Sequence, residues 1–242
     1  MSLISTEAFV INGFNYGETS KIVTFFSFES GKFSAVVKGV RALKSRYSGV
    51  FENMNLVNLF FNKKDNRSLQ VISKADCINS FKNVKKNLDK LNIGYQILEI
   101  TNKTTIEYDP HQEIFFLLKD ILLMLDNMKS PNDLPVLLFN VKLANYLGIE
   151  PAVLNLEEKF DGNQMVADGT FTVDKTLKLS EEEYNLLQLL RNYEFDLNEN
   201  ISCDVYIVDK LIKLYESYFI QGFHKSTFLK TNKIKEELKR KI

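Results

Sequence analysis

The chain has 242 residues, of which 45% are hydrophobic and 26% charged, which is typical of a globular protein. No apolar run approaches the roughly 20 residues of a membrane-spanning helix, and the first residues lack the pattern of a signal peptide, so we expect a cytoplasmic protein. The formal net charge is zero but unevenly distributed. Residues 1–90 carry 14 Lys and Arg against 7 Asp and Glu, residues 91–224 carry 10 against 22, and residues 225–242 carry 7 against 2. Two basic ends therefore flank an acidic middle.

Residues 6–80 contain β-prone segments separated by turn-forming residues. The expected strands are 6–11, 21–28, 32–37, 55–61 and 68–78, with Asn12-Gly13 read as a turn. Five short strands in about 75 residues predict a small closed barrel, and the OB-fold is the five-stranded candidate. Because OB-folds bind single strands through a basic groove with aromatic platforms, residues 1–80 are predicted to form a nucleic-acid-binding domain.

The loop after the third expected strand is cationic. Its nine residues contain no acid and four cations, Lys38, Arg41, Lys44 and Arg46. Such a loop suits a polyanion, most commonly nucleic acid, although a solvated surface loop is the alternative. The secondary candidate phosphate contacts are Lys32, Lys63 and Lys64. The candidate stacking platforms are Phe14, Tyr16, Tyr47 and Phe51, with core packing as the alternative for each.

From about residue 82 the apolar period changes from 2 to 3.6, which predicts helices. Apolar stripes mark helices over residues 88–98, 114–125, 134–147 and 204–223, and the last is expected to lie centrally. Ser180 and Glu183 have the spacing of a capping box. The acids at 181–183 could instead form a metal or acid–base site, but capping explains them without chemistry. The prediction is an α+β multidomain protein whose helical domain, a bundle, spans residues 81–242.

Residues that could carry catalysis or bind metal are isolated. Cys77 and Cys203 are too far apart and unpatterned to form a metal site, and no disulfide is expected between them. His111 and His224 lack nearby catalytic partners, which favours structural roles. No P-loop, metal-binding carboxylate set or activated nucleophile is visible, so we predict no catalytic residue, metal or cofactor.

Short motifs occur along the chain in a fixed order. They are Thr-Glu-Ala-Phe-Val at 6–10, Tyr-Gly-Glu-Thr-Ser at 16–20, Gly-Lys at 31–32, Lys-Gly-Val-Arg at 38–41, Lys-Ser-Arg at 44–46, Leu-Gly-Ile-Glu-Pro at 147–151, and the stretch 218–223 followed by Lys-Ser at 225–226. This ordered set resembles the RecO family of bacterial DNA repair and recombination mediators over nearly the whole chain. The resemblance implies an N-terminal OB-fold, a helical domain and often a zinc-binding insert after the Leu-Gly-x-x-Pro element.

The resemblance also implies a function. It implies binding of single- and double-stranded DNA, annealing of complementary strands, and work with RecR and with single-stranded DNA-binding protein (SSB) in loading RecA, without nucleotide hydrolysis. Two other classes stay open from the residues alone: a protein-interaction adaptor whose acidic helical domain is the working surface, and a hydrolase or nuclease. The adaptor predicts no salt-sensitive DNA binding, and the nuclease would need a metal.

One segment departs from the family pattern. Residues 152–179 contain neither Cys nor His, whereas tetrahedral zinc needs about four such ligands in tight spacing. We therefore expect a small, irregular, zinc-free insert that is held by turns and a short hairpin, with a short strand at 169–173. A RecR contact that depends on zinc does not follow. The basic tail 225–242 is either an arm that adds phosphate contacts or a solubilising segment.

Overall fold

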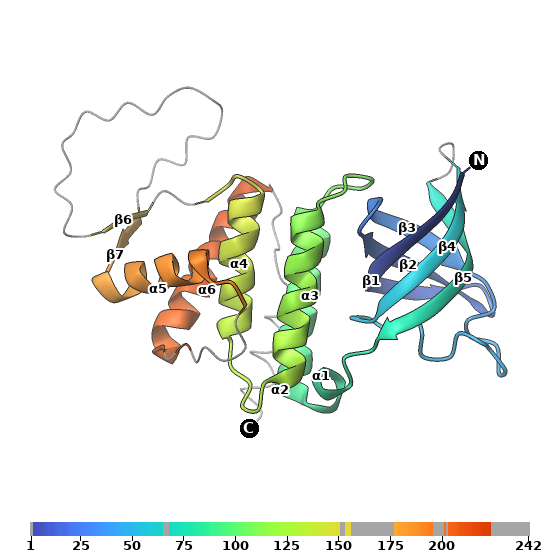
Figure 1. The fold of residues 1–242 in the computed structure, drawn as a ribbon, viewed down its shortest axis with the longest axis horizontal. Coiled ribbons are helices and arrows are strands. Elements are labelled where there is room, and N and C mark those ends of the chain that lie inside the picture. Colours follow the sequence, from blue (N-terminus) through green and yellow to red (C-terminus); the bar gives the residue numbers. More distant parts are fainter. Residues whose placement is uncertain are drawn as a thin grey trace.

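The first five strands close into a barrel. The computed structural model describes residues 2–64, 68–150, 153–155, 177–195, 201 and 203–223. The barrel order is β1-β2-β3-β5-β4, and only the β3–β5 pair is parallel. The strands are β1 (Ser2–Tyr16), β2 (Ser20–Ser27), β3 (Gly31–Val37), β4 (Leu56–Lys63) and β5 (Leu69–Asn79) (Figure 1). The predicted five-stranded barrel is confirmed.

Aromatic side chains fill the barrel. On β3, Phe33, Ala35 and Val37 are fully buried, as the period of 2 requires for one face of a strand. The Phe33 ring lies 5.5 Å from that of Phe25 on β2 and 5.0 Å from that of Phe61 on β4. The interior of the barrel is therefore filled by packed side chains, as in other small barrels.

Strand β1 differs from the prediction. Asn12 and Gly13 were expected to form a turn, but β1 continues through them to Tyr16. The β1–β2 register shifts between Val10 and Asn12, which marks an irregularity of the β-bulge type. Asn and Gly suit a bulge as well as a turn, so their local preference alone did not distinguish the two.

Six helices and a two-stranded sheet follow in the described residues. They are α1 (Lys82–Lys86), α2 (Leu88–Thr104), α3 (Gln112–Asn127), α4 (Leu134–Tyr146), β6 (Val153–Asn155), β7 (Leu177–Leu179), α5 (Glu181–Asn192) and α6 (Val205–Gly222). Figure 1 shows the barrel at one end of the molecule, α3 on the side of the helices that faces it, and α5 and α6 at the far end. The predicted helical region is confirmed. Every helix in the described part of the chain is too short or too polar to span a membrane.

Helix α4 is the central helix of the bundle, not α6 as expected. Residues 134–141 of α4 are all buried, and α4 contacts α2, α3, α5 and α6. Helix α6 is open to solvent at its start, where Val205 and Tyr206 are exposed, and it carries charged residues along one face. Its wide apolar stripe therefore covers α4 from one side.

The insert after α4 is described only at its two ends. There β6 and β7 pair in parallel, with Val153 opposite Leu177. The expected short strand at 169–173 lies outside the described residues, as does the basic tail 225–242.

A second hydrophobic core, separate from the barrel interior, joins the barrel to the helices. Phe9 of β1 lies with its ring 5.2 Å from that of Phe115 on α3 and 6.3 Å from that of Phe81, just before α1. All three rings are buried. The two parts are consequently joined through side-chain packing as well as through the chain.

Candidate nucleic-acid interface

The cationic loop 38–46 is docked against the turn between β1 and β2. Gly39 adopts a φ of 68°, a conformation that side-chain-bearing residues rarely adopt. Beyond this turn, the Arg41 backbone N–H donates to the Thr19 carbonyl at 2.8 Å, and Arg41 Nη1 donates to the Gly17 carbonyl at 3.1 Å. The loop thus has a fixed attachment to the end of β1.

The cations of the loop face solvent. Lys38, Arg41, Lys44 and Arg46 are all exposed. Among the described residues, Lys38 and Lys44 have no acidic partner within ion-pair distance. Their charges are therefore available to an anion from solution.

Arg46 has a structural role as well as a charge. Its Nη2 atom donates to the Tyr47 hydroxyl at 2.6 Å and to the Ser73 carbonyl on β5 at 3.2 Å, and its guanidinium lies 4.7 Å from the centre of the Tyr47 ring. A guanidinium group can bind a phosphate through two N–H groups, and in Arg46 part of this donor capacity is used within the protein. Arg46 fastens the loop to β5 while its charge remains at the surface.

Two of the four candidate stacking platforms lie in the core. Tyr47 is 6% exposed and Phe51 is 4% exposed, and their rings pack edge to face at 5.4 Å. The Tyr47 hydroxyl also donates to the Ser73 carbonyl at 3.2 Å. A buried ring offers no face to a base, so the prediction that Tyr47 and Phe51 act as open platforms is wrong, because the loop folds back and packs both rings onto the barrel.

Phe14 and Tyr16 are open to solvent. They are 56% and 52% exposed, respectively, and lie two residues apart near the end of β1. Tyr16 directly precedes Gly17, to which Arg41 binds. The fold thereby brings an exposed aromatic pair to the attachment point of the cationic loop.

Lys32 serves the join between the barrel and the helices. Its Nζ atom donates to the carbonyls of Asn102 and Thr105 at the end of α2, at 2.6 and 2.5 Å. A cation at these carbonyls satisfies groups that a helix end leaves unpaired. The prediction that Lys32 contacts phosphate is corrected accordingly, because its ammonium group is engaged by backbone oxygen atoms.

Lys63 and Lys64 are placed away from the attachment point of the loop. Lys63 pairs with Ser2 at the start of β1, whereas the loop docks at the other end of that strand. Lys63 Nζ lies 5.8 Å from the centre of the Tyr108 ring. The fold therefore does not gather these two lysines with the loop at the β1–β2 turn.

One cation near the loop was missed by sequence reasoning. Lys21 on β2 lies opposite Val37, the residue before Lys38. Nothing local in the sequence marks Lys21, because its position follows only from the β2–β3 register. It adds a further positive charge beside the loop.

The cysteines and histidines do not form a catalytic or metal site in the described residues. Cys77 and Cys203 are free, and burial raises the pKa of both thiols. His111 Nε2 lies 3.0 Å from Asp109 Oδ2, next to the start of α3. No group of three or more His, Cys, Asp or Glu in this part of the chain is arranged to hold a metal ion. His224 lies outside the described residues.

Comparison with known proteins gives consistent matches. The family model "Recombination protein O N terminal" matches residues 1–81, and "Recombination protein O C terminal" matches residues 85–221. A protein of Salinibacter ruber named DNA repair protein RecO is 32% identical over 154 residues, covering 63% of this chain and 58% of that protein. The protein of the same name in Chloroherpeton thalassium is 34% identical over 143 residues, covering 59% of this chain and 55% of that protein.

The match to these curated relatives is partial. The chain spans less than two thirds of the length of each. The two family models, however, run from the first strand of the barrel to the end of α6. Together with the five-stranded barrel and the helical region that follows it, they show that the chain belongs to the recombination protein O (RecO) family.

Proposed function

We propose that this protein is a non-enzymatic DNA repair and recombination mediator. It binds single- and double-stranded DNA, anneals complementary strands and helps load the recombinase RecA onto SSB-coated single strands, in concert with RecR. The observation that carries this proposal is the cationic loop 38–46, anchored beside the exposed rings of Phe14 and Tyr16. Membership of the RecO family supports it.

Annealing follows from charge neutralisation. Two DNA strands repel each other, and cations that bind phosphates lower that repulsion while releasing counterions. Lys38, Arg41 and Lys44 supply exposed charge for this step, and Arg46 adds its charge while holding the loop on β5. Backbone contacts of this kind do not read bases, so no sequence specificity is expected.

Stacking provides a second source of affinity for single strands. An exposed aromatic ring contributes about 1–3 kcal/mol per stacked base, and any base can supply the partner face. Tyr16 is the stronger candidate, because it adjoins Gly17, where the loop is attached. Double-stranded DNA lacks open base faces, so its binding depends on the cations alone.

The test measures the fluorescence anisotropy of a labelled single strand over a series of salt concentrations. Removing a cation that neutralises one phosphate should reduce the slope of log affinity against log salt by about 0.7. The variant with Lys38, Arg41, Lys44 and Arg46 all changed to Ala should therefore show a slope smaller by up to about 3 and a weaker affinity. The change Tyr16→Ser should weaken binding with little change of slope.

The matched control removes exposed lysines elsewhere. Lys82→Ala with Lys129→Ala removes two exposed cations outside the loop, and Lys38→Ala with Lys44→Ala removes two within it. The control should keep the wild-type slope. Equal binding by wild type and the loop variant would show that the DNA site lies outside the loop. If wild type does not bind DNA even at low salt, the mediator function is wrong and the adaptor function is favoured.

A further inference from the structure

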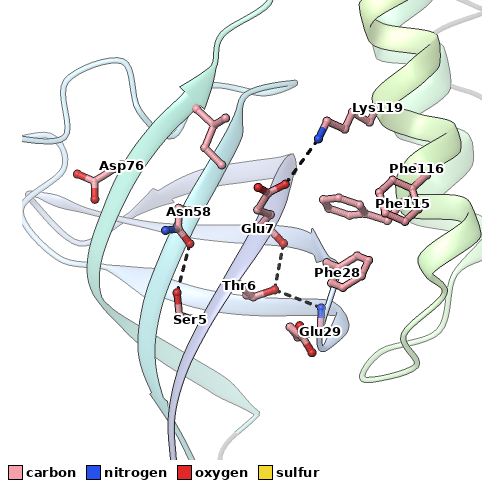
Figure 2. Close-up of a pocket in the computed structure, with 11 residues that line it drawn as sticks. Ser5, Thr6, Glu7, Phe28, Glu29, Asn58, Asp76, Phe115, Phe116 and Lys119 are labelled. Atoms are coloured by element: carbon pink, nitrogen blue, oxygen red, sulfur yellow. Dashed lines mark hydrogen bonds and ion pairs between the residues drawn. The ribbon is translucent and has the colours of Figure 1, made fainter.

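A groove of about 680 Å³ lies between the outside of the barrel and α3. Figure 2 shows its walls: β1 and β4 contribute side chains on one side, and α3 contributes Phe116 and Lys119 on the other. The volume is in the range of sites that bind compact ligands or short segments. The cationic loop does not line it.

One side of the groove is aromatic. The Phe28 ring lies 5.6 Å from both the Phe115 and the Phe116 rings, each in an edge-to-face arrangement. Phe116 is 48% exposed, and Ile78, across the groove on β5, is 49% exposed. Large apolar side chains left open around a hollow are typical of an interaction site.

The groove is also lined by acidic side chains. Glu7, Glu29 and Asp76 line the groove, and Lys119 is the one basic lining residue in the part of the chain that the structure describes. Lys119 Nζ is 3.9 Å from Glu7 Oε2, and Asp76 pairs with Lys74 at 2.9 Å. Glu29 is exposed, and its carboxylate has no ion-pair partner among the described residues. The lining thus has an excess of negative charge.

The negative charge of the groove limits the kinds of molecule that can bind there. Phosphates would be repelled by the carboxylates, so the groove is a poor site for nucleic acid. The barrel is closed, and β1 is paired on both sides, so a partner cannot add a strand here through its backbone. Recognition must therefore come from side chains, with positive charge for the acids and apolar surface for the rings.

We propose that this groove binds a short segment of a partner protein in which cationic and apolar side chains alternate. A cationic side chain of the segment lies over the Phe28 and Phe116 rings and pairs with Glu29, and an apolar side chain covers Ile78. This site is separate from the DNA interface and does not depend on the proposed function.

The probe is a fluorescein-labelled hexapeptide of alternating arginine and leucine, measured by anisotropy with the full chain. Two matched peptides carry glutamate in place of arginine, or serine in place of leucine. Wild type should bind the parent peptide at least about tenfold more tightly than either. Because a partly exposed ion pair contributes roughly 0.2–1 kcal/mol, Glu29→Gln should weaken parent-peptide binding about 1.4- to fivefold.

A second variant tests the aromatic wall without depending on charge. Phe116→Ser removes a half-exposed ring and should weaken peptide binding about three- to tenfold. The circular dichroism spectrum of this variant should match that of wild type, which shows that α3 remains folded. The control variants are Glu182→Gln on α5 and Tyr206→Ser on α6, both exposed positions outside the groove, and they should bind as wild type does.

The outcomes separate the possible occupants. Equal binding of the three peptides, or no effect of the groove variants, would overturn the proposal. Binding of a labelled short single strand that is weakened by the groove variants, in an otherwise wild-type chain and in the loop variant alike, would assign the groove to nucleic acid. Tighter peptide binding after removal of residues 225–242 would assign it to the chain's own basic tail. Unchanged DNA binding by the groove variants keeps this test independent of the mediator function.

Discussion

At the residue scale, Tyr215 is a buried phenol beside an ion pair. It is 1% exposed on α6, and the Arg191 Nε–Glu150 Oε1 pair, at 3.1 Å, lies close to it. The Tyr218 hydroxyl donates to the Glu150 carbonyl at 3.4 Å. Burial raises the pKa of Tyr215 far above its ordinary value of 10.0, and the charge of Glu150 adds to this.

This raised pKa makes stability depend on alkaline pH. Below pH 10 the phenol is neutral in both the folded and the unfolded chain. Above it, only the unfolded chain ionises, so the free energy of unfolding should fall by up to about 1.4 kcal/mol per pH unit. Urea unfolding between pH 8 and pH 11 should show this fall in wild type and lack that component in Tyr215→Phe.

The matched control at this scale is Tyr206→Phe. Tyr206 is on the same helix but 75% exposed, so its hydroxyl has no such burial. This variant should follow the wild-type pH dependence. If Tyr215→Phe and Tyr206→Phe have the same pH dependence, the burial of Tyr215 does not control alkaline stability.

At the element scale, the start of α5 confirms a sequence prediction. The Glu183 backbone N–H donates to Ser180 Oγ at 3.3 Å, and the Ser180 backbone N–H donates to Glu183 Oε2 at 3.1 Å, which forms the capping box. Glu183 also accepts from Lys210 Nζ of α6 at 2.5 Å. The acid triplet therefore starts the helix, and one of its members also ties α5 to α6.

Loss of the cap should weaken α5 by a predictable amount. Ser180→Ala removes the acceptor of the Glu183 N–H and should lower the free energy of unfolding by about 1 kcal/mol, whereas Ser180→Thr keeps the hydroxyl and should cost less. Chemical denaturation of the three proteins measures the difference. Equal stability of the Ala and Thr variants would show that the side-chain hydroxyl does not support the helix.

At the scale of the whole molecule, β3 begins at the join between the barrel and the helices. Gly31 has a φ of 64°, and a Cβ built on it would lie 2.1 Å from the Asp109 carbonyl oxygen, just before α3. Lys32 then donates to the end of α2, and its carbonyl accepts from the Tyr108 N–H at 2.8 Å. Two consecutive residues thus hold the barrel against the helical region.

Gly31→Ala should consequently disturb the join and not only the turn. A side chain in the left-handed conformation costs about 1–2 kcal/mol, and displacing the Asp109 backbone adds to this cost. Gly17→Ala is the control, because Gly17 has a similar φ of 58° with nothing within 4 Å of its added Cβ. In thermal unfolding, Gly31→Ala should lower the midpoint clearly more than Gly17→Ala. Equal midpoints would mean that the close approach to Asp109 relaxes at no cost.

Local sequence patterns were enough to predict most of the strands and helices and the charge of the loop. Strands and helices follow from short-range periodicity, the α5 cap from a spacing of three residues, and the cations of the loop from composition, so all of these are local properties. Local preference failed at Asn12 and Gly13, where a bulge and a turn use the same residues.

The exposure and the contacts of individual side chains could be known only from the three-dimensional structure. Tyr47 and Tyr16 look alike in the sequence, yet one is buried against the barrel and the other is exposed. Lys32 is a cation like Lys38, but the end of α2 engages its ammonium group. The groove combines Glu29 with Phe116, which are far apart in the chain. Burial and proximity depend on long-range register and packing, which no local pattern encodes.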